Sequence, residues 1–533
     1  MKVTSVDWQK VRQAHGPAIL LGFLLFVALL LRLIGIGFDL PYLMHPDEDA
    51  VVMPAINILK TGDWAPTRME YGTFHIYLLT AVFAGVFSLA ARDGRMATVD
   101  QLPLFERGTI PAIYTYPEYF LAARLVSAVL GMLFVLVVYM LGRRLGNQRQ
   151  GLIAAAIAAF LPALVVNDHF ATTDTALMFW VALSLYLLLR VYDNWERDNF
   201  WAYAGAGFVC GLAASTKYNG LVLAVPLLLV PLLRVRGLDE CLSWRVIAGP
   251  LAMLVGFLAG TPYALLDLPK FLYWFGYSLH LYNAPGREVV MPVWLWHVRF
   301  HLTNPHMPVM ILGVIGLVLS FRYWGMRRAA IVNSFAVVLW LAILGQTNAQ
   351  SRMWLPGASL FILWAALVLD ILMGRLVVIL NARQKNPHWA YALLLLLLLP
   401  FFYFALRYDL NFRQGDVRTR AREWVEANVP PGTAVAVDYF HPNLDPTVWP
   451  LTQTFFIFEH DAEWYMDNGV AYLVLNEVLN DFGQQAPGAN GRYQTLLQNV
   501  CEAGRVHGPF VATTQATITV YRVGPCESSS ESQ

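Results

Sequence analysis

Long apolar runs recur along the chain up to residue 407, and each has the length of a membrane-spanning helix. A helix needs roughly 20 predominantly apolar residues to cross a bilayer. The first run, Pro17 to Phe38, follows basic residues and lacks a small-residue cleavage pattern, so we predict a retained helix that begins in the cytoplasm. Further spans are predicted at residues 74–91, 118–141, 151–167, 173–189, 201–216, 218–233, 246–266, 307–321, 329–345, 354–373 and 390–407.

The clusters of Lys and Arg predict a topology, because cytoplasmic loops carry an excess of both. From residue 142 onward these clusters occupy alternate gaps between the apolar runs. These clusters lie on the same side of the membrane as the N-terminus only if one early segment does not cross. The best candidate is 74–91, which would then be a helix along the outer leaflet. The prediction is about eleven crossings of the plasma (inner) membrane, with the C-terminus outside. The alternative keeps 74–91 as a span and places another crossing within 92–117.

Composition agrees with this fold class, a polytopic α-helical membrane protein. Hydrophobic residues make up 57% of the 533 positions and charged residues only 14%, which excludes disorder and argues against a soluble enzyme. The formal net charge of +1 gives no basis for nucleic-acid binding. We therefore assign residues 1–407 to a transmembrane domain, whose first external loop is 39–117.

From Tyr408 the composition turns polar, which predicts a separate extracytoplasmic α/β domain over residues 408–533 with a flexible tail. The stretch "TRAREWVEANVPPGTAVAVDY" is typical of an amphipathic helix, a Pro-Pro-Gly stop and a strand. Residues 471–476 and 517–523 are predicted to form further strands. Cys501 and Cys526 share this domain, and an external location would permit a disulfide, but the sequence leaves their pairing open.

Carboxylates gather in the predicted external loops. The segment "LMHPDEDAVVM" carries Asp47 and Glu48, and Asp168 and Asp174 follow in the next external loop. Separated carboxylates on one face are able to hold a metal ion or to supply a base for a hydroxyl nucleophile. The structural alternative is that they cap or precede helices, since acidic residues favour helix N-termini.

Two cations also fall at the predicted outer surface. Lys217 is the only charge within 201–233, a stretch too long for one straight span, so we predict a hairpin at "STKYNG" with Asn219-Gly220 as the turn and Lys217 at the outer interface. Arg352 ends the polar run "GQTNAQSR", and a guanidinium can grip a phosphate with two parallel hydrogen bonds. The alternatives are snorkelling of Lys217 and a lipid contact or loop ion pair of Arg352. Carboxylates and cations on one face together favour group transfer from a lipid-phosphate carrier.

Several strings occur in the order found in a known superfamily, among them "LRLIGIGFDLPYLMHPDEDAVVMPAINILKTGDWAP" (31–66), "NDHFATTDTALMFWVALSLYLLLR" (167–190) and "QSRMWLP" (350–356). In these the chain resembles polyprenyl-phosphate-dependent glycosyltransferases of the GT-C superfamily, in particular the protein O-mannosyltransferase and aminoarabinose-transferase group. The resemblance implies a GT-C fold and inverting transfer of a sugar from a polyprenyl- or dolichyl-phosphate donor to a hydroxyl of a protein, lipid or glycan acceptor. "MWLP" departs from the expected Tyr-Leu-Leu-Pro, which leaves no hydroxyl at Met353.

The resemblance also implies roles for individual residues. Asp47 is expected to be the catalytic base and Glu48 to orient Asp47 or the acceptor. Asp174 is expected to shape the sugar and acceptor site, and Lys217 and Arg352 to hold the donor phosphate. Candidates for lining the substrate site are His45, Tyr218, His280 and Tyr282.

No cofactor is assigned, and a divalent cation stays open because members of the superfamily differ in metal use. The competing hypothesis is a transporter or flippase for a lipid or lipid-linked sugar. Such proteins place binding groups near the midplane and often contain internal repeats. Here the predicted midplane regions are almost free of charge and no repeat is visible in the sequence.

Overall fold

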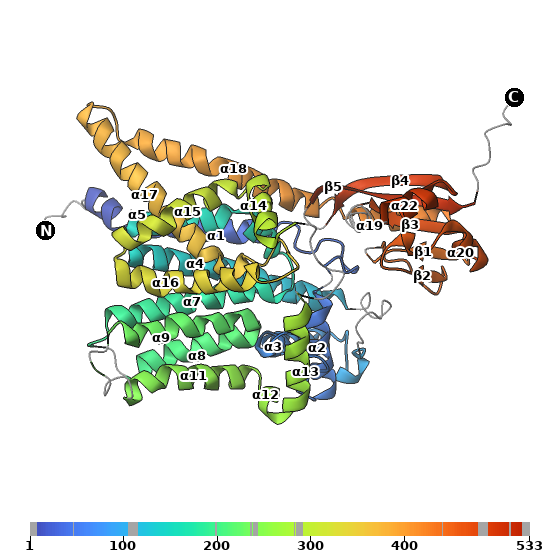
Figure 1. The fold of residues 1–533 in the computed structure, drawn as a ribbon, viewed down its shortest axis with the longest axis horizontal. Coiled ribbons are helices and arrows are strands. Elements are labelled where there is room, and N and C mark those ends of the chain that lie inside the picture. Colours follow the sequence, from blue (N-terminus) through green and yellow to red (C-terminus); the bar gives the residue numbers. More distant parts are fainter. Residues whose placement is uncertain are drawn as a thin grey trace. The chain divides into compact units, whose positions relative to one another are not determined.

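A computed structural model describes the chain apart from residues 1–7, 46, 105–115, 198–199, 235–236, 238–242, 282, 284–290, 440, 478–488, 511–512 and 525–533. The chain divides into two compact units (Figure 1). The first, here the helical unit, contains the described residues of 1–34, 47–105 and 118–407. The second, here the sheet unit, contains those of 35–46, 106–117 and 408–533.

The apolar runs of the sequence form the helices of the helical unit, which confirms the predicted fold class. Within the described residues, seven segments are long and apolar enough to cross a membrane, and an eighth forms if the bent pair α14 (Val293–Thr303) and α15 (Met307–Tyr323) counts as one. The larger number of predicted crossings stays a prediction. The remaining long helices are α1 (Trp8–Leu33), α3 (Phe74–Arg92), α4 (Pro117–Leu145), α7 (Thr173–Asp193), α8 (Phe200–Thr216), α11 (Trp244–Gly260), α16 (Met326–Leu344), α17 (Ala358–Ala382) and α18 (His388–Phe412).

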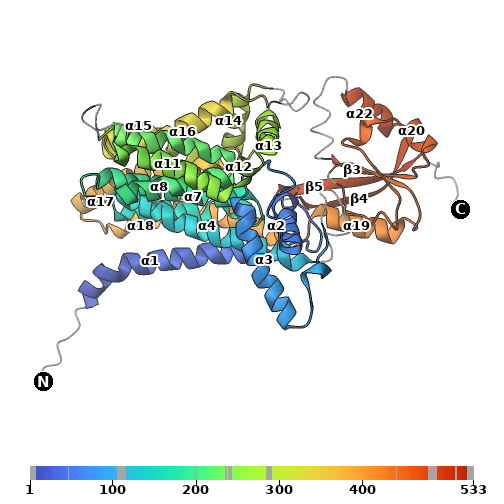
Figure 2. The same cartoon turned by 90° about the horizontal axis from the view of Figure 1, so that it is seen from below.

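Shorter helices occupy the connections. Figures 1 and 2 show α3 running across the direction of the long helices, although it is one of the segments long and apolar enough to cross a membrane. The shorter elements are α2 (Asp49–Thr61), α5 (Gln148–Phe160), α6 (Pro162–Asn167), α9 (Ala224–Leu232), α12 (Tyr263–Leu266) and α13 (Leu268–Leu281), with 3₁₀ turns η1 (Val99–Gln101), η3 (Tyr218–Leu223) and η4 (Leu355–Gly357).

Two predicted spans are interrupted. The segment 151–167 breaks between α5 and α6, where Leu161 takes an extended conformation because the following Pro162 disfavours a helical one. The segment 218–233 starts as the 3₁₀ turn η3 before it becomes α9. Between α8 and η3, Lys217 is extended (φ −153°, ψ 137°) and the chain turns back along α8, as the sequence predicted.

Glycines allow the helices around this turn to pack closely. A Cβ on Gly207 of α8 would lie 2.1 Å from the carbonyl oxygen of Gly249 in α11, and one on Gly211 would lie 2.1 Å from that of Met253. Figure 1 shows α7, α8 and α11 side by side. Small residues at four-residue spacing are typical of membrane helices, where backbone approach replaces the hydrophobic driving force.

The sheet unit contains a five-stranded sheet of order β2-β1-β3-β5-β4. The strand β1 (Val435–Val437) lies parallel to β2 (Leu451–Gln453) and to β3 (Tyr472–Asn476). The strand β5 (Thr513–Val523) pairs antiparallel with β3 and with β4 (Val500–Phe510). The predicted strands at 471–476 and 517–523 are thereby confirmed. Helical elements of this unit are α19 (Val417–Asn428), η5 (Ile457–Glu459), α20 (Ala462–Asp467) and α22 (Ala489–Leu497).

Alternating side chains give this sheet two apolar faces. Val435, Val437 and Val474 pack against α19, whereas Ala436 and Leu473 face the opposite way toward α20 and α22. This two-residue period is the one a strand imposes, so covering both faces requires helices on both sides. Cys501 in β4 is disulfide-bonded. Cys526, the partner that the sequence suggested, lies outside the described residues.

The segment 35–46 is held inside the sheet unit by polar contacts. The Asp39 carboxylate accepts hydrogen bonds from the Asp416 backbone N–H (2.9 Å to Oδ2) and the Thr419 hydroxyl (2.6 Å). Arg418 of α19 donates to the Met44 carbonyl oxygen at 2.8 Å. These bonds fix the chain just before Asp47.

We predict that Asp39→Ala lowers the free energy of unfolding of the sheet unit by about 1–3 kcal/mol, because donors at the start of α19 lose their acceptor. Limited proteolysis of the full chain in increasing urea, read at cleavage sites within 408–533, measures this. The control is Asp467→Ala, which removes an exposed carboxylate of the same unit. Equal urea dependence of the two variants would contradict the role assigned to Asp39.

Candidate active site

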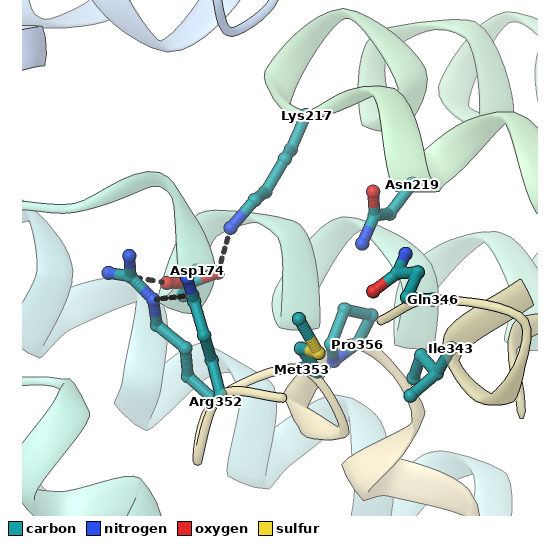
Figure 3. Close-up of a pocket in the computed structure, with 9 residues that line it drawn as sticks. Asp174, Lys217, Asn219, Ile343, Gln346, Arg352, Met353 and Pro356 are labelled. Carbon is teal, nitrogen blue, oxygen red and sulfur yellow. Dashed lines mark hydrogen bonds and ion pairs between the residues drawn. The ribbon is translucent and has the colours of Figure 1, made fainter. Parts of the chain in front are cut away.

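Four charged side chains from distant parts of the chain meet in the helical unit. The Lys217 Nζ lies 2.5 Å from Asp174 Oδ1, and Arg352 Nη1 lies 3.7 Å from Asp174 Oδ2. The same Arg352 nitrogen forms an ion pair with Asp47. Two carboxylates and two cations thus form one charge-balanced cluster, the acid–base cluster, part of which is drawn in Figure 3.

Local structure places each member at the end of an element. Asp174 is in the first turn of α7, where a carboxylate is stabilised by the helix dipole. Asp47 precedes α2, Lys217 is the extended residue between α8 and η3, and Arg352 precedes η4. Asp174 and Lys217 are only 2% and 8% exposed, and charges so buried require partners.

A small cavity of about 20 Å³ adjoins the cluster. Cations, one carboxylate and side-chain amides supply its polar wall, so it offers charge for an anion and hydrogen bonds for hydroxyl groups. It is lined by Asp174, Lys217, Asn219, Ile343, Gln346, Gln350, Arg352, Met353 and Pro356.

Three of these lining residues were not selected from the sequence. Asn219 was interpreted only as a turn residue, while Gln346 and Gln350 belong to the polar run before Arg352. Figure 3 shows the amides of Asn219 and Gln346 pointing toward each other across the cavity. The sequence signal that could have identified them is the presence of three uncharged amides near two cations. This signal is weak, because such residues are common in turns.

Glu48 has a different position from that of Asp47. Its carboxylate accepts two hydrogen bonds from Arg124 of α4, both at 2.8 Å, and one from the Ala171 backbone N–H at 2.8 Å. Both side chains of the pair are fully buried, and Glu48 does not line the cavity. Glu48 therefore joins the segment of Asp47 to α4 and to the loop that leads into α7.

Asp168 does not join the acid–base cluster. It forms a buried ion pair with Arg32 of α1 at 2.6 Å and accepts a hydrogen bond from Thr175 at 2.7 Å. A Cβ on Gly131 would lie 2.3 Å from Asp168 Oδ2, so a glycine is required beside this pair. Arg32, the one charge in the first apolar run, is thereby explained as a structural partner.

The candidate lining residues that the structure describes are not among those that line this cavity. The Tyr218 hydroxyl donates to the Met69 carbonyl oxygen at 2.7 Å, and the ring packs against Phe275. His280 is exposed on α13, and His45 belongs to the sheet unit. Tyr282 lies outside the described residues.

The acid–base cluster does not suit a divalent cation. Among the residues that the structure describes, no three His, Cys, Asp or Glu side chains are grouped to hold a metal. Asp47 and Asp174 are already paired with Arg352 and Lys217, whose positive charges would repel a metal ion. We therefore assign no step to a metal.

Comparison with known proteins places this geometry in context. Residues 80–283 match the family model described as dolichyl-phosphate-mannose-protein mannosyltransferase. An undecaprenyl phosphate-alpha-4-amino-4-deoxy-L-arabinose arabinosyl transferase of Pseudomonas fluorescens is 26% identical over 362 residues, which are 66% of this chain and 59% of that protein. One from Pseudomonas aeruginosa is 30% identical over 274 residues, covering 49% and 47%. The chain thus spans about half the length of these curated relatives.

Solved structures resemble nearly the whole chain. The Archaeoglobus fulgidus oligosaccharyltransferase matches with a TM-score of 0.54 at 13% identity, covering 87% of this chain and 70% of that one. ArnT from Cupriavidus metallidurans, solved with undecaprenyl phosphate, matches with a TM-score of 0.52 at 15% identity, covering 95% and 98%. The chain has the GT-C fold. This confirms the resemblance found in the sequence.

We predict that Arg124→Met lowers the free energy of unfolding by about 3–5 kcal/mol, because Glu48 is left buried without its cation. The double variant Glu48→Gln/Arg124→Met removes both charges and should recover most of that loss. Thermal unfolding of the purified protein in detergent compares them. Arg144→Met is the control, because its pair with Asp193 is partly exposed and Asp193 keeps Arg328. Equal losses in the single and double variants would mean that Arg124 acts through packing alone.

Proposed function

We propose that this protein is an inverting glycosyltransferase that moves a sugar from a polyprenyl-phosphate donor to an acceptor hydroxyl at the extracytoplasmic membrane face. The observation that carries the proposal is the meeting of Asp47, Asp174, Lys217 and Arg352 beside a polar cavity. The P. fluorescens and P. aeruginosa relatives, named for transfer from an undecaprenyl phosphate sugar, support the donor class. The sugar and the acceptor are left open.

The two cations are proposed to hold the donor phosphate. Arg352 is 24% exposed at its side chain and Lys217 10%, so Arg352 is the more accessible of the two. Asp174 holds both cations near one point. A phosphate at that point would compete with Asp47 for the Arg352 guanidinium, because both are anions that accept from the same donors. Binding of the donor would therefore release the Asp47 carboxylate.

The released Asp47 then acts as general base. The acceptor hydroxyl attacks the anomeric carbon, its proton passes to Asp47, and the bond from that carbon to the phosphate oxygen breaks on the opposite face. The electron pair leaves with the polyprenyl phosphate, whose growing charge Lys217 and Arg352 stabilise. No general acid is needed, since the phosphate leaves as an anion.

The orientation and domain roles are part of the proposal. Basic loops on one side favour a cytoplasmic N-terminus, which places the acid–base cluster outside. Residues 1–407 would then carry catalysis and 408–533 would help to select the acceptor. The transporter hypothesis has less support, because the cluster sits at helix ends such as the first turn of α7 and not at mid-span.

We predict that Asp47→Asn abolishes transfer, a loss of at least about a hundredfold, while affinity for undecaprenyl phosphate is retained. Release of undecaprenyl phosphate from its aminoarabinose conjugate, and of dolichyl phosphate from its mannose conjugate, is measured with membranes supplying the acceptor. The control is Asp93→Asn, an exposed carboxylate at the end of α3. Turnover by Asp47→Asn at the parent rate would remove Asp47 from the chemistry, and no release by the parent would reject both donors.

We predict that Arg352→Gln weakens binding of undecaprenyl phosphate by about tenfold or more, because a charge-assisted hydrogen bond is lost. Arg352→Lys should lose less, since it keeps the charge without the planar fork. Titration of the purified protein with undecaprenyl phosphate gives the dissociation constants. Arg299→Gln on the exposed side of α14 is the control. Unchanged binding by Arg352→Gln would place the phosphate elsewhere.

A further inference from the structure

A second cavity, of about 460 Å³, lies where α4 meets α5 and where α15 meets α16. None of its residues lines the candidate active site. Polar and apolar side chains contribute to it in similar measure. Its lining residues are Gly146, Asn147, Arg149, Gln150, Tyr323, Trp324, Leu367, Asp370, Ile371, Gly374 and Arg375.

The helix α16 separates the two cavities. Trp324, two residues before α16 starts, lines the second cavity, and Ile343, one residue before α16 ends, lines the first. At about 1.5 Å per residue, a helix of 19 residues is ~28 Å long. A bilayer core is roughly 30 Å thick. The second cavity is therefore at the opposite membrane face from the acid–base cluster.

An ion pair forms one wall of this cavity. Asp370 in the middle of α17 accepts hydrogen bonds from Arg149 Nε at 2.5 Å and from Asn147 Nδ2 at 2.8 Å, one on each oxygen. Arg149 also donates to the Asp370 carbonyl oxygen at 3.1 Å. A Cβ on Gly374 would lie 3.2 Å from Arg149 Nη2, so glycine leaves room for the guanidinium. The only carboxylate of the lining is thus neutralised.

The groups that remain are donors. Among the buried side-chain atoms of the described lining, those without a hydrogen-bond partner are Gln150 Nε2 and Trp324 Nε1, and both are N–H groups. Gln150 is 1% exposed and Trp324 3% exposed. Within the described residues, Arg375 has no carboxylate at ion-pair distance, so its charge is uncompensated. Hydrogen-bond donors without a partner, next to a cation without a carboxylate partner, are suited to bind an anion.

The apolar part of the cavity wall favours one class of anion over another. Leu367 and Ile371 lie one turn apart on α17 and give the cavity an apolar side next to Arg375. A free phosphate ion has no apolar part to cover them, whereas a phospholipid places its phosphate and its glycerol and acyl groups side by side. We propose that this cavity binds the phosphate group of an anionic glycerophospholipid, with Arg375, Trp324 and Gln150 as donors.

The test uses the full-length, delipidated protein in detergent and titrates it with dioctanoyl phosphatidylglycerol. Arg375→Gln and Trp324→Phe should each weaken binding about tenfold; the second removes the N–H and keeps a smaller aromatic ring. Arg383→Gln lies beyond the lining at the end of α17, and Trp340→Phe removes a buried, unpartnered indole N–H of α16, so both should bind like the parent.

The same titration with inorganic phosphate separates the two sources of the anion. The proposal expects inorganic phosphate to bind at least tenfold more weakly than the lipid. Equal binding of both, with the same dependence on Arg375, would overturn the lipid assignment in favour of a free-anion site. Parent-like lipid binding by both Arg375→Gln and Trp324→Phe would overturn the site itself. The readout is lipid binding alone, so the result does not depend on glycosyl transfer.

Discussion

The buried pair of Glu48 and Arg124 is the contact on which the candidate active site depends. It fixes the residue next to Asp47 onto α4, and through the Ala171 N–H it also fixes the loop that leads into α7 and Asp174. Breaking a buried pair on one side costs about 3–5 kcal/mol, a large part of the 5–15 kcal/mol that keeps a typical domain folded. Two loops far apart in sequence are therefore held together by Glu48 and its partners.

Charge balance also explains how the acid–base cluster is stable without a ligand. Two carboxylates and two cations neutralise each other, so none of the four charges is buried alone. In the proposed reaction the donor phosphate replaces Asp47 as the partner of Arg352. The exchange gives Arg352 one anionic partner in place of another, and it frees Asp47 only when the donor is in place.

Much of this organisation could be predicted from the sequence, because hydropathy and unusual charge are local signals. The apolar runs predicted the fold class. Lys217 and Arg352 were recognisable as candidates because they are cations in predicted external loops, where cations are rare. The break at Pro162 was missed because the apolar run continues through it. The partners Arg124 and Arg32 could not be assigned, since an ion pair between residues 76 or 136 positions apart is decided by packing. The same limit left the contacts by which Glu48 positions the segment of Asp47 unassigned and hid the amides of Asn219 and Gln346.

The two cavities differ in how their cations are compensated, and this difference matches their proposed roles. At the acid–base cluster Arg352 already has carboxylate partners, so a bound phosphate must compete with them and is easily released after the sugar has moved. At the second cavity Asp370 neutralises Arg149 and leaves Arg375 uncompensated, so an anion there meets no competitor and is retained. A site that turns over needs the first arrangement, and a site that anchors a lipid needs the second. Because the rigid helix α16 separates them by about the thickness of a bilayer core, the two proposed phosphate sites would also fix the height of the protein in the membrane.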